Sequence, residues 1–217
     1  MSVLSVTVTR PKPGRTRDSI ALGVQATKLL ARVGAADCRL IVAEAAGEGA
    51  GTQVFTIEFD TNEAYGVFSD KAAVDPQLEA LADQLTAEDS PVVVEFQGIV
   101  TEIPVGGRSG RGRVIQSYIS RPKPGQLEAA IDLTGRAFKF LEKQGAVSTR
   151  LFQQTVAGSQ SETLVAAWEF ETMQALGKAG DAFMTDPKGI ALAQSVSQAD
   201  APIMVLNSAI YREVPLG

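Results

Sequence analysis

Asn62, Tyr65 and Asp70 have side chains of the types that proton transfer on a phenol or an enol requires. An oxygenase that works without a cofactor must remove a proton from its substrate and hold the resulting anion. A carboxylate or a tyrosine beside an amide or arginine is therefore the minimum set. Of the residues found 111 positions later in the chain, only Asp181 keeps its type. We therefore expect any such chemistry to run in one half of the chain, while Asp70 fits equally well as a residue that caps or ends a helix.

A basic, proline-rich segment occurs twice, and both copies read Arg-Pro-Lys-Pro-Gly. Its four cations are Arg10, Lys12, Arg121 and Lys123. Each pair lies between a predicted strand and a predicted helix, where the N–H groups of a helix N-terminus help to hold an anion. These residues are therefore candidate ligand-binding residues, and the alternative is a rigid turn that carries solvated charges.

A second charged pattern also occurs twice, as Arg39 with Glu58 and as Arg150 with Glu169. Within each pair the two residues lie on strands that a glycine-rich hairpin joins, so we expect them to be close to cross-strand partners. The pattern predicts a structural ion pair inside each half, and the alternative is a pair that faces a ligand.

Large, polarizable side chains are more frequent in the second half of the chain. The residues are Tyr118, Trp168, Met173 and Phe183, where the first half has Thr7, Ile57, Asn62 and Ala72. Aromatic and methionine side chains suit a pocket for a flat apolar ligand, so these four are further candidate ligand-binding residues. The alternative is that they fill the core.

The composition excludes several classes of function. The chain has no histidine, which removes imidazole as a base or metal ligand, and Cys38 is its single cysteine. No phosphate-binding, dinucleotide-binding or zinc-binding motif is present, so we expect no cofactor and no metal. Residues 1–106 carry 8 basic and 15 acidic side chains, and residues 107–217 carry 12 and 10. Neither half has the basic field that nucleic acid requires, and no apolar stretch is long enough to span a membrane.

An internal repeat accounts for the recurrence of these residues. When residues 3–106 are placed on residues 114–217 without a gap, 37 of the 104 pairs are identical. Each copy has the same pattern of alternating apolar residues, helical periodicity and turn signals. The pattern predicts strands at 3–9, 39–44, 52–59 and 92–103 and a helix at 20–33 that stops at Gly34. It also predicts two short helices up to about residue 87, capped by Thr61 and by Asp75 with Pro76.

The second copy repeats this order. Its predicted strands are 114–120, 150–155, 163–170 and 203–214, its first helix is 131–144, and its two short helices begin at Thr172 and Asp186. The order βαββαβ is that of the ferredoxin-like fold, in which helices cover only one face of an antiparallel sheet. The bare faces carry apolar residues such as Ile41, Val54, Phe152 and Val165. Burying them is favourable by about 25 cal/mol per Å2, so we expect the two sheets to shield each other.

The predicted architecture is therefore α+β, with two tandem ferredoxin-like units packed as one barrel within the chain. Residues 1–106 form the first unit, residues 107–113 a short, flexible, basic linker, and residues 114–217 the second unit.

These features resemble the dimeric α/β barrel superfamily, and the segment Phe-Asp-Thr-Asn-Glu-Ala-Tyr-Gly at 59–66, followed by Asp75-Pro76, is most similar to NIPSNAP-type members. The resemblance covers nearly the whole chain. It implies a barrel of the kind that two single-copy subunits normally form, here made inside one polypeptide. The superfamily includes cofactor-free monooxygenases, lactone isomerases and haem enzymes. This chain departs from the haem branches because it has no histidine to bind iron.

Three functions remain open on the sequence. The first is a barrel that binds a small apolar or aromatic molecule, and the second is a cofactor-free monooxygenase or isomerase acting on an aromatic or polyketide-like substrate. The third is a non-enzymatic module that associates with itself as a homo-oligomer. The single cysteine fits a reducing, cytoplasmic location, and we expect neither nucleic acid nor a membrane as a partner.

Overall fold

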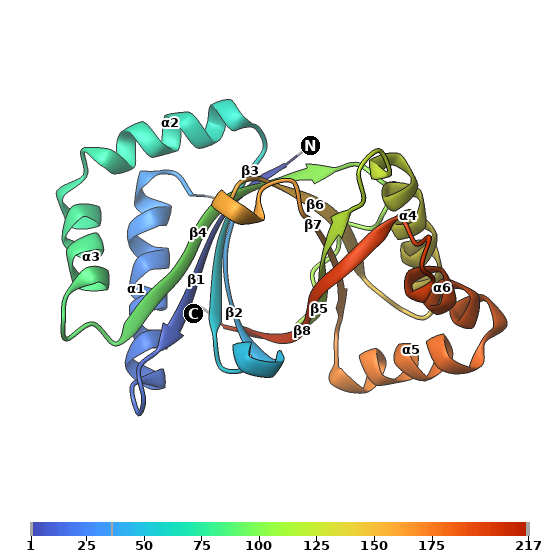
Figure 1. Cartoon of the computed structure of the whole chain (residues 1–217). Coiled ribbons are helices and arrows are strands. Elements are labelled where there is room, and N and C mark those ends of the chain that lie inside the picture. Colours follow the sequence, from blue (N-terminus) through green and yellow to red (C-terminus); the bar gives the residue numbers. More distant parts are fainter. Residues whose placement is uncertain (1, 36, 216–217) are drawn as a thin grey trace.

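The two halves of the chain contain the same order of strands and helices. The computed structural model describes residues 2–35 and 37–215. The first half consists of β1 (Val3–Pro11), α1 (Thr16–Val33), β2 (Asp37–Ala45), β3 (Gln53–Phe59), α2 (Asn62–Ala73), α3 (Pro76–Thr86) and β4 (Val92–Ile103). The second half consists of β5 (Val114–Pro122), α4 (Leu127–Lys143), β6 (Ser148–Val156), β7 (Leu164–Phe170), α5 (Met173–Thr185), α6 (Pro187–Ser197) and β8 (Ile203–Val214). Figure 1 shows the three helices of each half on opposite outer sides of the strands.

The helix boundaries follow from capping residues that the sequence predicts. The hydroxyl groups of Thr61 and Thr172 accept hydrogen bonds from main-chain N–H groups in the first turns of α2 and α5. Asp75 and Asp186 do the same for α3 and α6, each with proline at the next position. Gly34 has a φ of 113°, a left-handed conformation that favours glycine and ends α1. These predicted boundaries are confirmed, whereas α1 and α4 begin at Thr16 and Leu127, before the predicted starts at residues 20 and 131.

The eight strands in the described part of the chain belong to one closed antiparallel barrel. Going around it, the order is β1-β3-β2-β8-β5-β7-β6-β4. Each half contributes four neighbouring strands, and the halves join edge to edge through β2 with β8 and β4 with β6. The predicted barrel is thereby confirmed, because the inner faces of the two sheets meet across its interior. The pairing between the halves also removes sheet edges that would otherwise be open to other chains.

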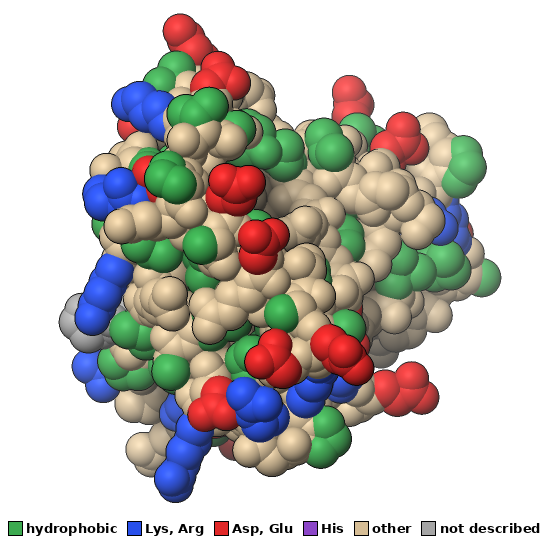
Figure 2. All heavy atoms as spheres, turned by 90° about the vertical axis from the view of Figure 1, so that its left-hand side faces the viewer, with side chains coloured by type: hydrophobic (Ala, Val, Ile, Leu, Met, Phe, Trp, Pro, Cys, Tyr) green, Lys and Arg blue, Asp and Glu red, His purple; other side chains and the backbone are tan. Residues whose placement is uncertain are grey.

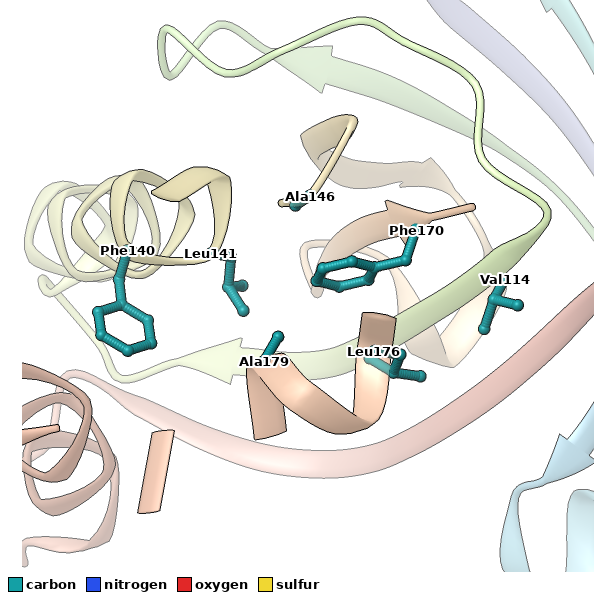
Figure 3. Packing of buried hydrophobic residues seen from close by; sticks show 7 residues of the cluster. All are labelled: Val114, Phe140, Leu141, Ala146, Phe170, Leu176 and Ala179. Atoms are coloured by element: carbon teal, nitrogen blue, oxygen red, sulfur yellow. The ribbon is translucent and has the colours of Figure 1, made fainter. Parts of the chain in front are cut away.

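The outer face of the barrel packs against the helices. In the second half, Figure 3 shows the ring of Phe170 on β7 beside Leu141 of α4 and Leu176 and Ala179 of α5. A smaller cluster around Leu22 and Leu81 lies between the helices and strands of the first half. On the face that α1 to α3 cover, acidic and basic side chains are interspersed and not gathered by sign (Figure 2). No helix in the described part of the chain is long and apolar enough to cross a membrane.

The segment 107–113 between the halves is closely packed, so the prediction of a flexible linker is wrong. The main-chain oxygen of Val147 accepts a hydrogen bond from the N–H of Gly110 at 3.1 Å. A Cβ atom built on Gly107 would lie 2.1 Å from the main-chain oxygen of Thr149. The glycines are therefore present because this segment runs against the main chain of β6, and not because it needs freedom.

We expect Gly107→Ala to lower the free energy of unfolding by about 1 to 3 kcal/mol, because its Cβ must displace main-chain atoms. Gly66 on α2 is the matched control, since nothing lies within 4 Å of its built Cβ. Gly66→Ala should stabilise the protein by about 0.5 to 1 kcal/mol through its higher helix propensity. Urea denaturation of the two variants checks both signs, and equal effects would show that segment 107–113 is not tightly packed.

A candidate ligand-binding cavity inside the barrel

The barrel interior contains a cavity of about 430 Å3 to which both halves contribute. Because successive residues of a strand point to opposite faces, every second residue points inward. On β1 and β5 the inward residues are Leu4, Val6, Val8, Ile115, Ser117 and Ile119. The four apolar residues that the sequence placed on the bare sheet faces also line this space. The volume lies in the range of about 300 to 1,000 Å3 that is typical of small-molecule sites.

Two clusters of charged residues close one end of the cavity, where β1, β2, β5 and β6 begin. Arg39 donates hydrogen bonds to Glu169 at 2.8 and 3.1 Å and to Glu213 at 3.3 Å. Arg150 donates to Glu58 at 2.6 and 2.9 Å. Its Nε also donates to Glu102 at 2.9 Å. The Arg39 and Glu169 side chains are only 18% and 8% exposed, so this end of the cavity is well shielded.

These ion pairs run between the halves, so the predicted pairing of Arg39 with Glu58 and of Arg150 with Glu169 is wrong. The register of the hairpin gives the reason. Arg39 lies opposite Thr56, while Glu58 lies opposite Asp37. Closure of the barrel brings a carboxylate of the other half within reach of each arginine. The two clusters therefore fasten the halves to each other.

Three carboxylates of these clusters, Glu58, Glu102 and Glu213, are stabilised in their charged form. Burial alone would raise the pKa of Glu58, but hydrogen bonds and charge from Arg150 outweigh it and lower that pKa below its ordinary value. The same balance lowers the pKa of Glu102 and, through Arg111 and Arg39, that of Glu213. Carboxylates held in this way are weak general bases, so the clusters are better suited to structure than to proton transfer.

We expect the protein to lose stability in acid because of these lowered pKa values. A glutamate whose pKa is lower in the folded than in the unfolded state stabilises the fold above its unfolded pKa. That contribution is lost as the pH falls through the ordinary value of 4.5 and on through the lowered folded value. Urea denaturation between pH 7 and pH 3 should show this decline. Glu58→Gln should make the decline shallower, and an unchanged slope in this variant would contradict the assignment.

Tyr211 and Gln154 are two of the polar cavity residues that the sequence did not identify as candidates. Burial raises the pKa of Tyr211, and a hydrogen bond with Ser117 opposes this only in part, so its phenol stays protonated. In the first half the corresponding positions hold Val100 and Ala43. A comparison of inward positions between the repeats could have identified both residues, because each half should fill equivalent positions alike unless one has an additional role.

The opposite end of the cavity is more exposed, and only one of the four predicted basic ligand residues reaches it. Arg10 lines this end and pairs with Glu95 at 2.5 Å. Arg121 instead donates to a main-chain oxygen at 3.2 Å. Lys12 and Lys123 donate to the main-chain oxygens of the loops that follow α3 and α6. The prediction of an anion site is not supported, because Arg10 is neutralised by a carboxylate and both lysines brace turns.

The four large side chains of the second half lie between the sheet and its helices, and not on the cavity. Trp168 stacks on Tyr118 with ring centroids 5.2 Å apart and donates its indole N–H to Gln116. Met173 and Phe183 pack against the cluster around Phe170. The expected pocket at these residues is therefore wrong and the core-filling alternative holds. On their strands Tyr118 and Trp168 are the outward neighbours of Ser117 and Glu169, which point inward.

The three candidate catalytic residues also lie away from the cavity. All of them are on α2, where Asn62 and Asp70 are exposed. The ring of Tyr65 packs edge-on against Phe59 with centroids 5.5 Å apart. Asp70 does not end the helix, because α2 continues to Ala73. The fold therefore does not bring these residues together with the cavity in the barrel.

The residues of the cavity do not suit haem, which the resemblance implies for one branch of the superfamily. Proteins hold haem iron through His, Cys, Met or Tyr. The chain has no histidine, and of the described residues that line the cavity only Tyr211 belongs to these types. Its raised pKa disfavours the phenolate that iron would need. Within residues 2–35 and 37–215, no group of three or more His, Cys, Asp or Glu side chains is arranged to hold a metal ion.

Comparison with known proteins identifies solved structures with a similar fold but no related sequence. No family model and no curated protein sequence matches the chain. Among solved structures, an anthrone oxidase-like protein has a TM-score of 0.63 and 13% identity, with 99% of this chain and 91% of that chain covered. A mutant chlorite dismutase from Candidatus Nitrospira defluvii has a TM-score of 0.56 and 11% identity, covering 99% and 92%.

A proposed monooxygenase from Fusobacterium nucleatum is similar to the same degree, with a TM-score of 0.59 and 11% identity over 99% of this chain and 93% of that chain. Identities this low show the fold alone. The closed antiparallel barrel and its outer helices agree with that fold. The chain therefore has the fold of the dimeric α/β barrel proteins.

Proposed function

We propose that the barrel binds a small, mainly apolar molecule in its interior cavity. The observation that carries this proposal is the cavity of about 430 Å3 inside a closed barrel, whose inner surface is more apolar than polar. Eight-stranded barrels are wide enough to hold one small ligand when side chains do not fill them. The polar groups of the cavity that are not already paired with one another would set the orientation of the ligand.

A tryptophan placed in the cavity tests this proposal. Val165 points inward from β7, so Val165→Trp fills space that a ligand would occupy. We expect this variant to bind 2-naphthol at least about tenfold more weakly than the wild type in a fluorescence titration, a loss of about 1.4 kcal/mol. Val67→Trp is the control, because Val67 is exposed on α2. Equal affinity of the two variants, or no binding by the wild type, would reject the proposal.

Cofactor-free oxygenation is a second candidate function. It is supported by the names of two similar structures, an anthrone oxidase-like protein and a proposed monooxygenase, and by the protonated Tyr211 in the cavity. A phenol that stays neutral can donate a hydrogen bond to the oxygen of an enolate and stabilise it. For anthrone as the test substrate, one O2 converts the CH2 group to a carbonyl and yields anthraquinone and one water.

Tyr211→Phe should lower the rate of anthrone oxidation by about a hundredfold if Tyr211 stabilises an enolate. Tyr65→Phe is the matched control, because Tyr65 packs on Phe59 and does not line the cavity. One O2 should be consumed for each anthraquinone formed, as measured with an oxygen electrode and by the absorbance of anthraquinone. Equal rates of anthrone oxidation in both variants would rule out oxygenation at this site.

Three finer statements remain proposals. The first is that residues 1–106 and 114–217 arose as a tandem duplication of one ferredoxin-like, NIPSNAP-type unit, supported by 37 identical pairs and by the repeated order of elements. The second is that residues 107–113 divide these units.

The third is self-association, supported by the exposed apolar run of Met204, Val205 and Leu206 at the start of β8. Light scattering that gives a monomer at all concentrations would contradict the third.

A further inference from the structure

Gln154 is a buried polar side chain in the cavity that is left without a partner. It lies on β6, follows the inward residues Arg150 and Phe152 at the spacing of two, and is 4% exposed. Its side-chain oxygen Oε1 is buried and has no hydrogen-bond partner among the described residues. Its main-chain groups are satisfied, because its N–H donates to Thr163 at 2.9 Å and its carbonyl accepts from Glu162 at 2.9 Å. The unmet requirement therefore belongs to the side chain alone.

An unpartnered buried amide is costly, and the fold does not need one at this position. Most buried polar groups in proteins are hydrogen-bonded, so each exception requires an explanation. The first half holds Ala43 at the equivalent position of β2, where a methyl group packs without any polar requirement. The torsion that turns a glutamine amide about its last bond is soft. The oxygen of Gln154 can therefore turn toward a molecule in the cavity.

The charges that line the cavity argue against an ionic ligand. Arg39 and Arg150 each make ion pairs with two carboxylates, and Arg10 is paired with Glu95. The shielded end thus has no excess positive charge for an anion. A cation would have to compete with an arginine for carboxylates that are already hydrogen-bonded. A neutral molecule avoids both costs, and Phe96 and Phe152 contribute aromatic carbon atoms to the lining of the cavity.

We propose that Gln154 accepts a hydrogen bond from a hydroxyl group of a neutral, mainly apolar ligand and thereby selects for that hydroxyl. This inference rests on the proposed binding of a small molecule inside the barrel. It makes Gln154 the residue that decides specificity, because a ligand that lacks a donor leaves the side-chain oxygen of Gln154 unsatisfied. Sites with such a buried acceptor discriminate strongly against analogues that cannot donate.

Three probes of similar shape test the inference with the full-length protein. They are 2-naphthol, which donates a hydrogen bond, 2-methoxynaphthalene, which only accepts one, and naphthalene, which does neither. At a pH where 2-naphthol is neutral, we expect the wild type to bind it roughly tenfold more tightly than 2-methoxynaphthalene. Gln154→Leu should bind the two with nearly equal affinity and should bind naphthalene at least as well as the wild type.

Gln153→Leu is the matched control, because Gln153 is the neighbouring residue on the outward face of β6 and does not line the cavity. It should keep the preference for 2-naphthol. Binding of all three probes by the wild type without a preference would overturn the role of Gln154 and leave the proposed binding function intact. The same holds if Gln154→Leu keeps the preference. Failure of the wild type to bind any probe would overturn both proposals.

Discussion

Arg150→Ala is expected to lower the free energy of unfolding by about 3 kcal/mol, one of the two largest losses that we expect from a single substitution. The change leaves Glu58 and Glu102 without the cation that holds them in their charged form. Removing one partner of a buried ion pair typically costs about 3 to 5 kcal/mol, because the remaining charge is poorly solvated. Both carboxylates keep some contact with solvent, which places the expected loss at the lower end of that range.

The matched control for this prediction is Arg212→Ala. Arg212 pairs with Glu44 across the other junction between the halves, that of β2 with β8, and both side chains are more than one third exposed. An exposed pair contributes less than about 1 kcal/mol. Urea denaturation at pH 7 measures both variants. Comparable losses would mean that the Arg150 cluster is no more important than a surface ion pair.

Phe170→Ala is the second large prediction, with an expected loss of about 3 to 5 kcal/mol. The ring is 0% exposed and fills the space between β7 and the helices α4 and α5 (Figure 3). Its removal leaves a void that the surrounding side chains cannot close fully. Val74→Ala provides the control, since that side chain is 82% exposed at the end of α2 and should change stability by less than about 0.5 kcal/mol.

The Phe170 variant also reports on the coupling of the two halves. Because both sheets belong to one barrel, the loss in the second half should lower the stability of the whole chain. Trp168 fluorescence reports on the second half, and far-ultraviolet circular dichroism reports on both. The two signals should give the same midpoint in urea. Two separated transitions would indicate that the halves unfold independently.

The sequence predicted those parts of the fold that depend on local rules. The limits of β4 and β8 follow from apolar runs behind proline, and the starts of α2 and α3 follow from Thr61 and Asp75. Closure into a barrel was also predictable, because the apolar inner faces had to be buried. The partners of Arg39 and Arg150 were not, since neighbours along a hairpin are known from the sequence and neighbours across a closed barrel are not.

The candidate site was harder to predict than the fold, because the sequence alone does not show which side chains of a strand point into the barrel and which point outward. Tyr118 and Trp168 are the residues most typical of a ligand pocket by type, but they lie on the outer face of the barrel. Their neighbours Ser117 and Glu169 point inward. A one-residue difference in the assumed alternation moves a side chain from one face to the other. A comparison of the inward positions of the two halves would have singled out Gln154 and Tyr211, and the structure places both on the inner face of the barrel.

A pair of double-mutant cycles tests most directly whether the two halves close a single barrel through their charged clusters. One cycle combines Arg150→Ala with Glu58→Ala in the other half, and the second combines Arg150→Ala with Glu169→Ala in the same half. The structure predicts a coupling energy of about 1 to 3 kcal/mol for the first pair and less than about 0.5 kcal/mol for the second. Strong coupling of Arg150 to Glu169, with none to Glu58, would show that each half forms its own ion pair and would contradict the barrel.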